Sequence, residues 1–245
     1  MQLDVRRLGR IGYQEALDLQ LNLVEERRAE RIPDTLLLLE HPPVITMGRS
    51  AVDSDILAPT QQLEQAGARV FRITRGGETT YHGPGQLVGY MIANLYEHQR
   101  RLKRFIHNLE EVFIRLLDEE YSISAARDDE HRGVWVGSEK ITAIGIAVSR
   151  GITMHGFAFN VHTDLSHFGW IIPCGITDRG QTSVRALTGR DVSLAQASDA
   201  VVRRFPAVLG YSSVSDPDAG SFRTISGSSE SGSSESGSSE SGSSG

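Results

Sequence analysis

Cysteine is almost absent from this chain: of its 245 residues, only Cys174 carries a thiol. A single cysteine excludes an intrachain disulfide, and it excludes zinc and iron–sulfur sites built from several thiolates. Two roles stay open for Cys174, that of a small buried core residue and that of a reactive nucleophile. Its surroundings, IIPCGI at residues 171–176, predict a Pro-Cys-Gly turn after an apolar run. Turns on a rigid scaffold often carry reactive groups.

Long apolar segments are missing as well. No stretch approaches the roughly 20 apolar residues of a membrane-spanning helix. The N-terminus has no apolar core of the kind found in signal peptides. We therefore expect a soluble cytoplasmic protein without membrane contact, in a compartment where a lone thiol stays reduced.

The C-terminal residues 227–245 repeat Gly, Ser and Glu and contain no apolar side chain. Such a segment buries too little surface to offset the entropy of ordering it. We predict one folded domain, residues 1–213, and a disordered tail, residues 214–245. Without the three glutamates of the repeat, the net charge of −6 falls to −3, which does not indicate nucleic-acid binding.

Hydrophobic periodicity predicts helices interspersed with strands. The predicted helices are residues 13–31, with Tyr13, Leu17, Leu21 and Val24 on one face, residues 102–117, and a last helix opened by the capping box SLAQ at residues 193–196. The predicted strands are residues 35–40, buried on both faces, residues 70–74, residues 87–95 and a meander over residues 133–161. The hairpin turns favour an α+β fold with a mixed, mainly antiparallel sheet flanked by helices.

A glycine-rich segment, RGGETTYHGPGQ at residues 75–86, lies between two predicted strands. It matches neither the phosphate-binding P-loop nor the dinucleotide-binding fingerprint. Its glycines allow the backbone to approach a ligand closely, and their N–H groups could bind an oxyanion. The alternative is a long hairpin loop whose glycines only meet conformational demands.

A thiol with a pKa near 8.5 needs a partner to become a thiolate at neutral pH. The histidines that could act as its base are His82, His131, His155, His162 and His167, and spacing does not choose among them. Lys140 is another candidate, because it opens the strand 140–148 and alternation puts it in the apolar row of Thr142, Ile144, Ile146 and Val148. A partly desolvated lysine suits proton transfer, and its cation favours a thiolate. The alternative is a solvated lysine at a hairpin turn.

Two further patterns allow two interpretations each. Gly156 and Ala158 share one face of a strand, which leaves either a groove for an acyl chain or room for tight packing. The basic cluster, which we define as Arg100, Arg101, Lys103 and Arg104, opposes the dipole of the helix it begins. It is either a binding surface or a solvated helix end.

Four blocks of the sequence resemble the lipoyl(octanoyl) transferases, in the order found in that family. They are RGGETTYHGPGQL (residues 75–87), KITAIG (140–145), HGFAFNV (155–161) and PCGI (173–176). The resemblance runs from the first predicted helix to about Tyr211 and leaves out the C-terminal repeat.

The resemblance implies the fold of biotin and lipoate protein ligases, with residues 1–213 as the catalytic domain. It implies transfer of an octanoyl group from the phosphopantetheine of acyl carrier protein to a specific lysine of lipoyl domains. Those domains belong to 2-oxoacid dehydrogenase complexes and the glycine-cleavage H protein. No cofactor and no metal are expected, and we expect a monomer.

By the same resemblance, Cys174 is the acyl-thioester nucleophile and Lys140 is the residue that lowers its pKa. The substrate-binding residues that the resemblance implies are Arg75, Gly76, Gly77, Glu78, Thr79, Thr80, Tyr81, His82, Ala143, Ile144, Gly145, Gly156, Phe157 and Ala158.

Three other functions remain open from the sequence. An ATP-dependent lipoate or biotin ligase of the same fold would activate a free acid and would not need Cys174. A non-catalytic module would only bind lipoyl domains or carrier protein. A thiol hydrolase with His82 or His155 as base would use water in place of the acceptor lysine.

Overall fold

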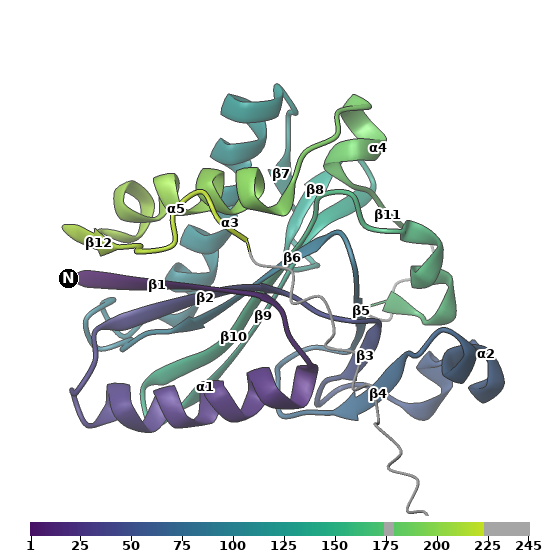
Figure 1. Cartoon of the computed structure of the whole chain (residues 1–245), viewed down its shortest axis with the longest axis horizontal. Helices are drawn as coiled ribbons and strands as arrows, with labels where there is room; N and C mark the ends of the chain where they lie inside the picture. Colours follow the sequence, from purple (N-terminus) through teal and green to yellow (C-terminus); the bar gives the residue numbers. More distant parts are fainter. Residues whose placement is uncertain (174–178, 223–245) are drawn as a thin grey trace, which may run out of the picture.

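The computed structural model describes residues 1–173 and 179–222. Its main sheet has nine strands in the order β12-β1-β2-β6-β10-β9-β8-β7, with β11 paired to β9 (Figure 1). In chain order the strands of this sheet are β1 (Gln2–Arg10), β2 (Asp34–Glu40), β6 (Gln86–Ile92), β7 (Ala126–Arg127), β8 (Val134–Val136), β9 (Glu139–Ser149), β10 (Ile152–Asn160), β11 (Gly180–Gln181) and β12 (Ser213–Ser215).

The strand pairings confirm the predicted α+β class with a mixed, mainly antiparallel sheet. From β2 across to β7 every neighbouring pair is antiparallel, whereas β1 pairs in parallel with β2 and β12, and β11 pairs in parallel with β9. A second sheet has the order β4-β3-β5. Its strands are β3 (Val44–Met47), β4 (Arg69–Arg72) and β5 (Thr79–His82).

Helices cover both faces of the main sheet (Figure 1). The helices α3 (Leu102–Tyr121) and α5 (Leu194–Leu209) pack on one face, and α1 (Tyr13–Arg28) packs on the other. The short helices are α2 (Thr60–Gln65), α4 (Val184–Thr188), η1 (Asp53–Asp55) and η2 (Leu165–Trp170). No helix in the described ranges is both long and apolar enough to span a bilayer.

The leucine run of β2 explains this arrangement in layers. Leu36 and Leu38 are fully buried under α3 and α5, whereas Leu37 and Leu39 are fully buried against α1. Successive side chains of a strand point to opposite faces, so a continuous apolar run needs a layer on each side. The prediction that this strand is buried on both faces is confirmed.

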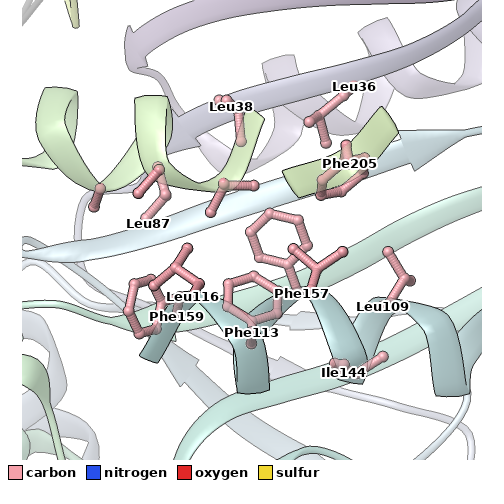
Figure 2. Close-up of a cluster of buried hydrophobic side chains, with 14 of the residues drawn as sticks. Leu36, Leu38, Leu87, Leu109, Phe113, Leu116, Ile144, Phe157, Phe159 and Phe205 are labelled. Carbon is pink, nitrogen blue, oxygen red and sulfur yellow. The ribbon is translucent and has the colours of Figure 1, made fainter. Parts of the chain in front are cut away.

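Aromatic rings join α3 to the centre of the sheet (Figure 2). The ring centroid of Phe113 lies 4.7 Å from that of Phe157 and 5.3 Å from that of Phe159, both on β10. Phe113 and Phe159 are completely buried. This packing fixes β10, whose opposite face carries residues of the cavity described below.

The predicted helix over residues 13–31 is α1, but it ends at Arg28 and its buried face differs from the predicted one. Leu21 is 49% exposed, and the buried row is Tyr13, Ala16, Gln20, Leu23, Val24 and Arg27. Gln20 and Arg27 occupy core-facing positions of this helix, so hydrophobicity alone assigned the wrong face. The last helix and its capping box of Ser193 and Gln196 are confirmed.

Six strands of the described residues are not among the predicted ones: β1, β3, β5, β7, β11 and β12. In β1 the buried row contains Arg7, a charged residue that disrupts the apolar alternation. The strand β3 has four residues, and β5 lies inside the glycine-rich segment that was interpreted as a loop.

The folded part of the chain extends past residue 213, the predicted end of the domain. Residues 213–215 form β12 beside β1, and Asp216 forms an ion pair with the buried Arg7 at 2.7 Å. Burial of the Arg7 guanidinium is offset by Asp199 and Asp216 together.

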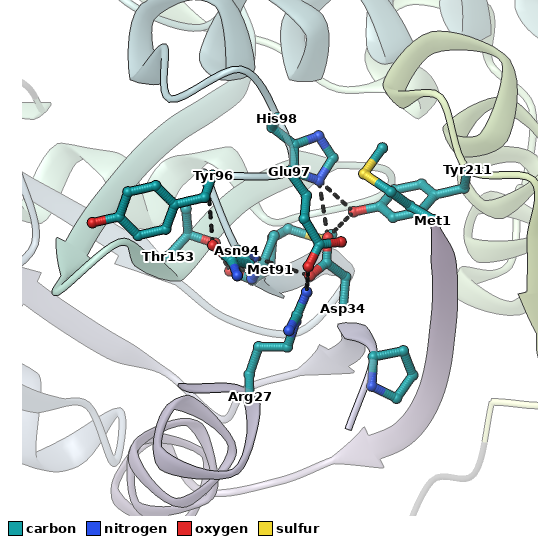
Figure 3. A network of polar contacts seen from close by, with 12 residues as sticks. Met1, Arg27, Asp34, Met91, Asn94, Tyr96, Glu97, His98, Thr153 and Tyr211 are labelled. Atoms are coloured by element: carbon teal, nitrogen blue, oxygen red, sulfur yellow. Dashed lines mark hydrogen bonds and ion pairs between the residues drawn. The ribbon is translucent and has the colours of Figure 1, made fainter. Parts of the chain in front are cut away.

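A buried carboxylate joins four elements at one end of the sheet (Figure 3). Asp34 of β2 accepts hydrogen bonds from Arg27 Nε at 2.8 Å, His98 Nε2 at 2.9 Å and the Tyr211 hydroxyl at 2.8 Å. The backbone N–H of Asn94 donates a fourth at 3.0 Å. Burial would raise the pKa of Asp34, but these hydrogen bonds together hold it below its ordinary value.

We expect Asp34→Ala to lower the free energy of unfolding by about 3–5 kcal/mol, because Arg27 would be left buried without its partner. Urea denaturation measures this, and Asp4→Ala, which removes a partly exposed pair with Arg6, is the control with an expected loss below about 1 kcal/mol. Since the pKa of Asp34 is lowered in the fold, its contribution is present at neutral pH and is lost as the pH falls through that lowered value. Equal losses for the two variants would contradict this assignment.

Candidate active site

A cavity of about 470 Å³ lies where β5, β9, β10 and the segment before β5 meet. This is within the range of small-molecule sites in proteins. Residues of three blocks singled out in the sequence line it: Lys140, Arg75, Gly76, Gly77, Glu78, Thr80, His82, Ala143, Ile144, Gly145, Gly156, Phe157 and Ala158. The structure thus brings together residues as far apart in sequence as Arg75 and Ala158.

Thr79 and Tyr81 do not line the cavity, although the resemblance places them among the substrate-binding residues. Successive residues of β5 point to opposite sides, so Thr80 and His82 face the cavity and the other two face away. The Thr79 hydroxyl donates to Asp55 Oδ2 at 2.8 Å, and the Tyr81 hydroxyl forms a 2.8 Å hydrogen bond with His167 Nδ1. These two side chains anchor β5 from behind.

The segment before β5 is held by backbone hydrogen bonds to residues 48–50. The N–H groups of Gly48, Arg49 and Ser50 donate to the carbonyls of Glu78, Arg75 and Gly77 at 3.1–3.2 Å. A Cβ on Gly48 would lie 2.2 Å from Gly77 O, so glycine is required for this close approach. The glycine-rich wall of the cavity is therefore fixed by its own backbone.

The Arg75 side chain lies in the cavity wall and bonds to the same segment. Its guanidinium donates to Glu78 O at 2.8 Å and to Gly76 O at 3.0 Å. A Cβ on Gly145 would lie 2.7 Å from Arg75 Cδ, so the arginine stem occupies the space that a side chain at 145 would take. Gly145 of β9 therefore packs directly against the Arg75 side chain of the segment before β5.

Gly156 serves close strand packing. A Cβ there would lie 2.1 Å from Gly89 O on the neighbouring strand β6. Of the two interpretations of this pattern, packing explains Gly156. Ala158, paired with Ala143 across β10 and β9, keeps the cavity floor free of large side chains.

Lys140 reaches the cavity because β9 contains a bulge. Trp135 of β8 pairs with Lys140, but its neighbour Val134 pairs with Thr142, so Ile141 is an extra residue on β9. An extra residue reverses the alternation of the strand beyond it. Ile141 lies in the core under α3, and Lys140 lines the cavity. The predicted shared row of Lys140 with Thr142 is therefore wrong.

The interpretation of Lys140 as a solvated turn residue is also wrong. Its exposed fraction is only 3%. Its ammonium Nζ lies 4.8 Å from the centroid of the Trp135 ring. A buried cation over an aromatic face is electrostatically attracted to the ring. Lys140 thus brings a positive charge to one end of the cavity.

Of the five histidines considered as bases, His82, His131 and His155 line the cavity. Burial, with the charges of His41 and Arg75, lowers the pKa of His82 to about 3, and burial with Arg75 lowers that of His155 to about 4. His82 Nδ1 donates to Gln86 Oε1 at 2.8 Å, which fixes its tautomer. Imidazoles with such low pKa values are poor acceptors for a thiol proton.

Two tyrosines of the cavity were missed from the sequence. Burial raises the pKa of Tyr13 to about 12, opposed by the Arg75 charge. The Tyr90 hydroxyl donates to Nε2 of His41 at 2.8 Å, because Nδ1 of this neutral imidazole donates to Ile11 O. Both tyrosines come from core-facing positions of α1 and β6, where they resemble ordinary core residues.

Cys174 lies outside the described residues, but its flanks do not. Before it, the Ile172 N–H donates to Asp55 O at 2.7 Å, and Asp55 also holds β5 through Thr79. After it, Gln181 pairs with Lys140, and the Thr182 N–H donates to Lys140 O at 3.0 Å. The residues before Cys174 are thus attached to η1, which contacts β5, and the residues after it are attached to β9.

No set of three or more histidine, cysteine or acidic side chains is grouped to hold a metal ion within residues 1–173 and 179–222.

Residues 12–206 match the family model of the lipoyl protein ligase A/B catalytic domain. The octanoyltransferase of Alkaliphilus metalliredigens is 50% identical over 211 residues, which cover 86% of this chain and 97% of that protein. The octanoyltransferase of Caldicellulosiruptor saccharolyticus is 53% identical over 211 residues, with 86% and 90% covered.

The chain belongs to the octanoyltransferase family.

The fold of this octanoyltransferase also matches solved structures. A crystal structure of lipoate-protein ligase A bound with ATP superposes with a TM-score of 0.66 at 16% identity, and the match covers 88% of this chain and 90% of the ligase. At such low identity the match establishes the fold alone. The predicted family and the ligase-like fold are both confirmed.

Proposed function

We propose that this octanoyltransferase moves the octanoyl group from octanoyl-acyl carrier protein to a specific lysine of a lipoyl domain, through a thioester on Cys174. The acceptor domains are those of 2-oxoacid dehydrogenase complexes and the glycine-cleavage H protein. Relatives named octanoyltransferases, about half identical over nearly the whole domain, support octanoyl transfer in protein lipoylation. The attachment of one Cys174 flank to η1, which contacts β5, and of the other flank to β9 supports the role of the thiol.

In the first half-reaction, the Cys174 thiolate attacks the carbonyl carbon of the donor thioester. The bond from that carbon to the phosphopantetheine sulfur breaks, and this sulfur leaves with a proton from solvent. Lys140 brings the cation that stabilises the Cys174 thiolate. The fixed backbone around the glycine-rich wall offers N–H groups of the kind that stabilise an oxyanion.

In the second half-reaction, the neutral amine of the acceptor lysine attacks the acyl carbon on Cys174. The carbon–sulfur bond breaks, the thiolate is regenerated, and the amide nitrogen releases a proton. Dividing the transfer into two steps is covalent catalysis. Because the first step exchanges one thioester for another, neither ATP nor a metal or other cofactor is needed.

The lowered pKa values of His82 and His155 disfavour these two residues as the base of a Cys–His pair. A base must be matched in pKa to the proton it takes. His82 and His155 have pKa values of about 3 and 4. A positive charge near the thiol stabilises the thiolate without having to accept its proton, which favours the proposed Cys174–Lys140 dyad.

The position of the basic cluster does not favour it as the docking site for the acidic carrier protein. Arg100 packs on the Tyr96 ring, and the Leu95 N–H donates to Gly151 O in the hairpin that follows β9. Lys140 lies at the opposite end of β9, roughly 30 Å away at about 3.3 Å per residue. We therefore propose the carrier protein as donor without assigning its docking surface.

Mixing the enzyme with octanoyl-carrier protein and no acceptor is expected to yield an octanoyl adduct on Cys174 in single-turnover mass spectrometry. The adduct forms because the first half-reaction does not require the acceptor. Adding a lipoyl domain should discharge the adduct as the acceptor gains the same mass. Transfer to the acceptor with no adduct at any time, in a rapid-quench series, would contradict the covalent scheme.

The same assay, run with other substrates, separates the alternative functions. An ATP-dependent ligase would form product from free octanoate and ATP, and it would do so without Cys174. A binding module would bind its partners with no turnover, and a hydrolase would release octanoate when no acceptor is present. A donor series of different acyl lengths, run in the same assay, gives the chain-length preference.

A further inference from the structure

Trp135 lies behind Lys140, outside the lining of the cavity. Its exposed fraction is 3%, and it pairs with Lys140 across β8 and β9. The centroid of its ring lies 4.8 Å from Lys140 Nζ and 5.2 Å from Arg179 Cζ. Neither the sequence motifs nor the family resemblance points to this residue.

The orientation of the Trp135 ring is fixed from several sides. Its indole Nε1 donates to His131 O at 3.1 Å, and the His131 ring lies 6.2 Å away by centroids. Asp128 accepts a hydrogen bond from the His131 backbone N–H at 2.8 Å and forms an ion pair with Arg179 at 2.5 Å. Among the described residues, Lys140, Arg179 and His131 lie beside the ring, and Asp128 contacts Arg179 and His131. Glu130 and Arg132 line the cavity together with Lys140.

We propose that Trp135 is a positioning residue that holds the Lys140 ammonium at the cavity. The inference rests on the proposed role of Lys140 beside the Cys174 thiol. A lysine side chain has four rotatable bonds and loses considerable freedom when one orientation is needed. The bulge at Ile141 turns Lys140 toward the cavity, and the ring face then favours the orientation in which its charge lies over the indole.

Burial makes this contact stronger than it would be at the surface. Cation–π attraction grows when the pair is removed from water, and both side chains here are about 97% buried. The hydrogen bond from Nε1 keeps the ring from following the lysine. In this proposal Trp135 acts on the reaction through the place of Lys140 Nζ.

Alkylation of the single cysteine by iodoacetamide, followed over pH, tests the proposal without substrate. We expect Trp135→Leu to slow the reaction at neutral pH by about 3- to 30-fold, the range of a buried cation–π contact, and to shift its rate–pH profile upward. Trp135→Phe keeps an aromatic face and should recover much of the rate. It also serves if the leucine variant does not fold.

A double-mutant cycle with Lys140→Met separates positioning from general loosening. If Trp135 acts through Lys140, Trp135→Leu changes the rate by less than twofold in the Lys140→Met background. Val134→Ala is the matched control, because it loosens the same strand on its core side and should leave the pH profile in place.

Each outcome of the cycle decides the proposal. The same fold-change for Trp135→Leu in both backgrounds would overturn the positioning role and leave the role of Lys140 intact. A rate–pH profile of Lys140→Met identical to that of the parent protein would overturn the proposed role of Lys140 itself, and with it the reason for Trp135. Coupling of threefold or more, with recovery in Trp135→Phe, supports the positioning role.

Discussion

Replacing Cys174 with alanine is expected to lower octanoyl transfer by about 10⁴-fold or more and to abolish the acyl-enzyme adduct. Removing the group that forms the covalent intermediate closes the two-step route, and only the binding contribution of the site remains. The rate is measured as gain of octanoyl mass on a purified lipoyl domain. The variant keeps the volume of the site nearly constant, so binding of the lipoyl domain should change little.

Two controls make the Cys174 result specific. Cys174→Ser keeps a nucleophilic atom at the same place, but its hydroxyl ionises far less readily, so transfer should stay below about 1% of the parent rate. Thermal unfolding of both variants checks that the fold is kept. Product made by Cys174→Ala from free octanoate and ATP would instead identify a ligase of the same fold.

Lys140→Met is expected to slow the transfer by about 10- to 100-fold and to raise the apparent pKa of the Cys174 thiol by about one to two units. An opposite charge close to a titrating group lowers the pKa of an acid by about one to three units, and methionine removes that charge with little change in volume. The thiolate fraction at neutral pH falls accordingly, so kcat and the alkylation rate should fall together. Rate–pH profiles of alkylation measure this shift.

The control for Lys140 is Lys103→Met, which removes the only other lysine of the chain. Lys103 is exposed at the start of α3 and has no part in the proposed dyad. Its variant should match the parent protein in rate and in pH profile. The role of Lys140 would be refuted by a profile that also stays in place for Lys140→Met, and the lysine would then be a packing residue.

Much of the site could be predicted because its motifs are local runs with distinctive chemistry. The structure places the glycine-rich segment and residues of the blocks at 140–145 and 155–161 around one cavity, as expected for motifs of a single site. The fold class could be predicted because its signals are local in sequence. The leucine run of β2 requires a layer on each side of the sheet, and the turns of the meander require hairpins.

What failed depended on contacts that a linear pattern does not contain. The face of Lys140 was assigned by alternation, and one extra residue in β9, visible only in the pairing with β8, reversed it. The strand β1 was not predicted because Arg7 occupies one of its core positions. The Arg7 charge is neutralised by Asp199 and Asp216, which are distant in sequence. The substrate-binding roles of Thr79 and Tyr81 stay a prediction, although alternation along β5 turns both side chains away from the cavity, toward Asp55 and His167.

The contact between Lys140 and Trp135 also bears on a side reaction, acylation of the enzyme's own lysine. In the proposed scheme Lys140 lies beside the acyl-thioester, and an uncharged amine there would capture the acyl group as a permanent amide. The ring face attracts only the ammonium form, which has no lone pair with which to attack a thioester. We therefore expect the contact with the Trp135 ring to disfavour transfer of the acyl group to Lys140 itself.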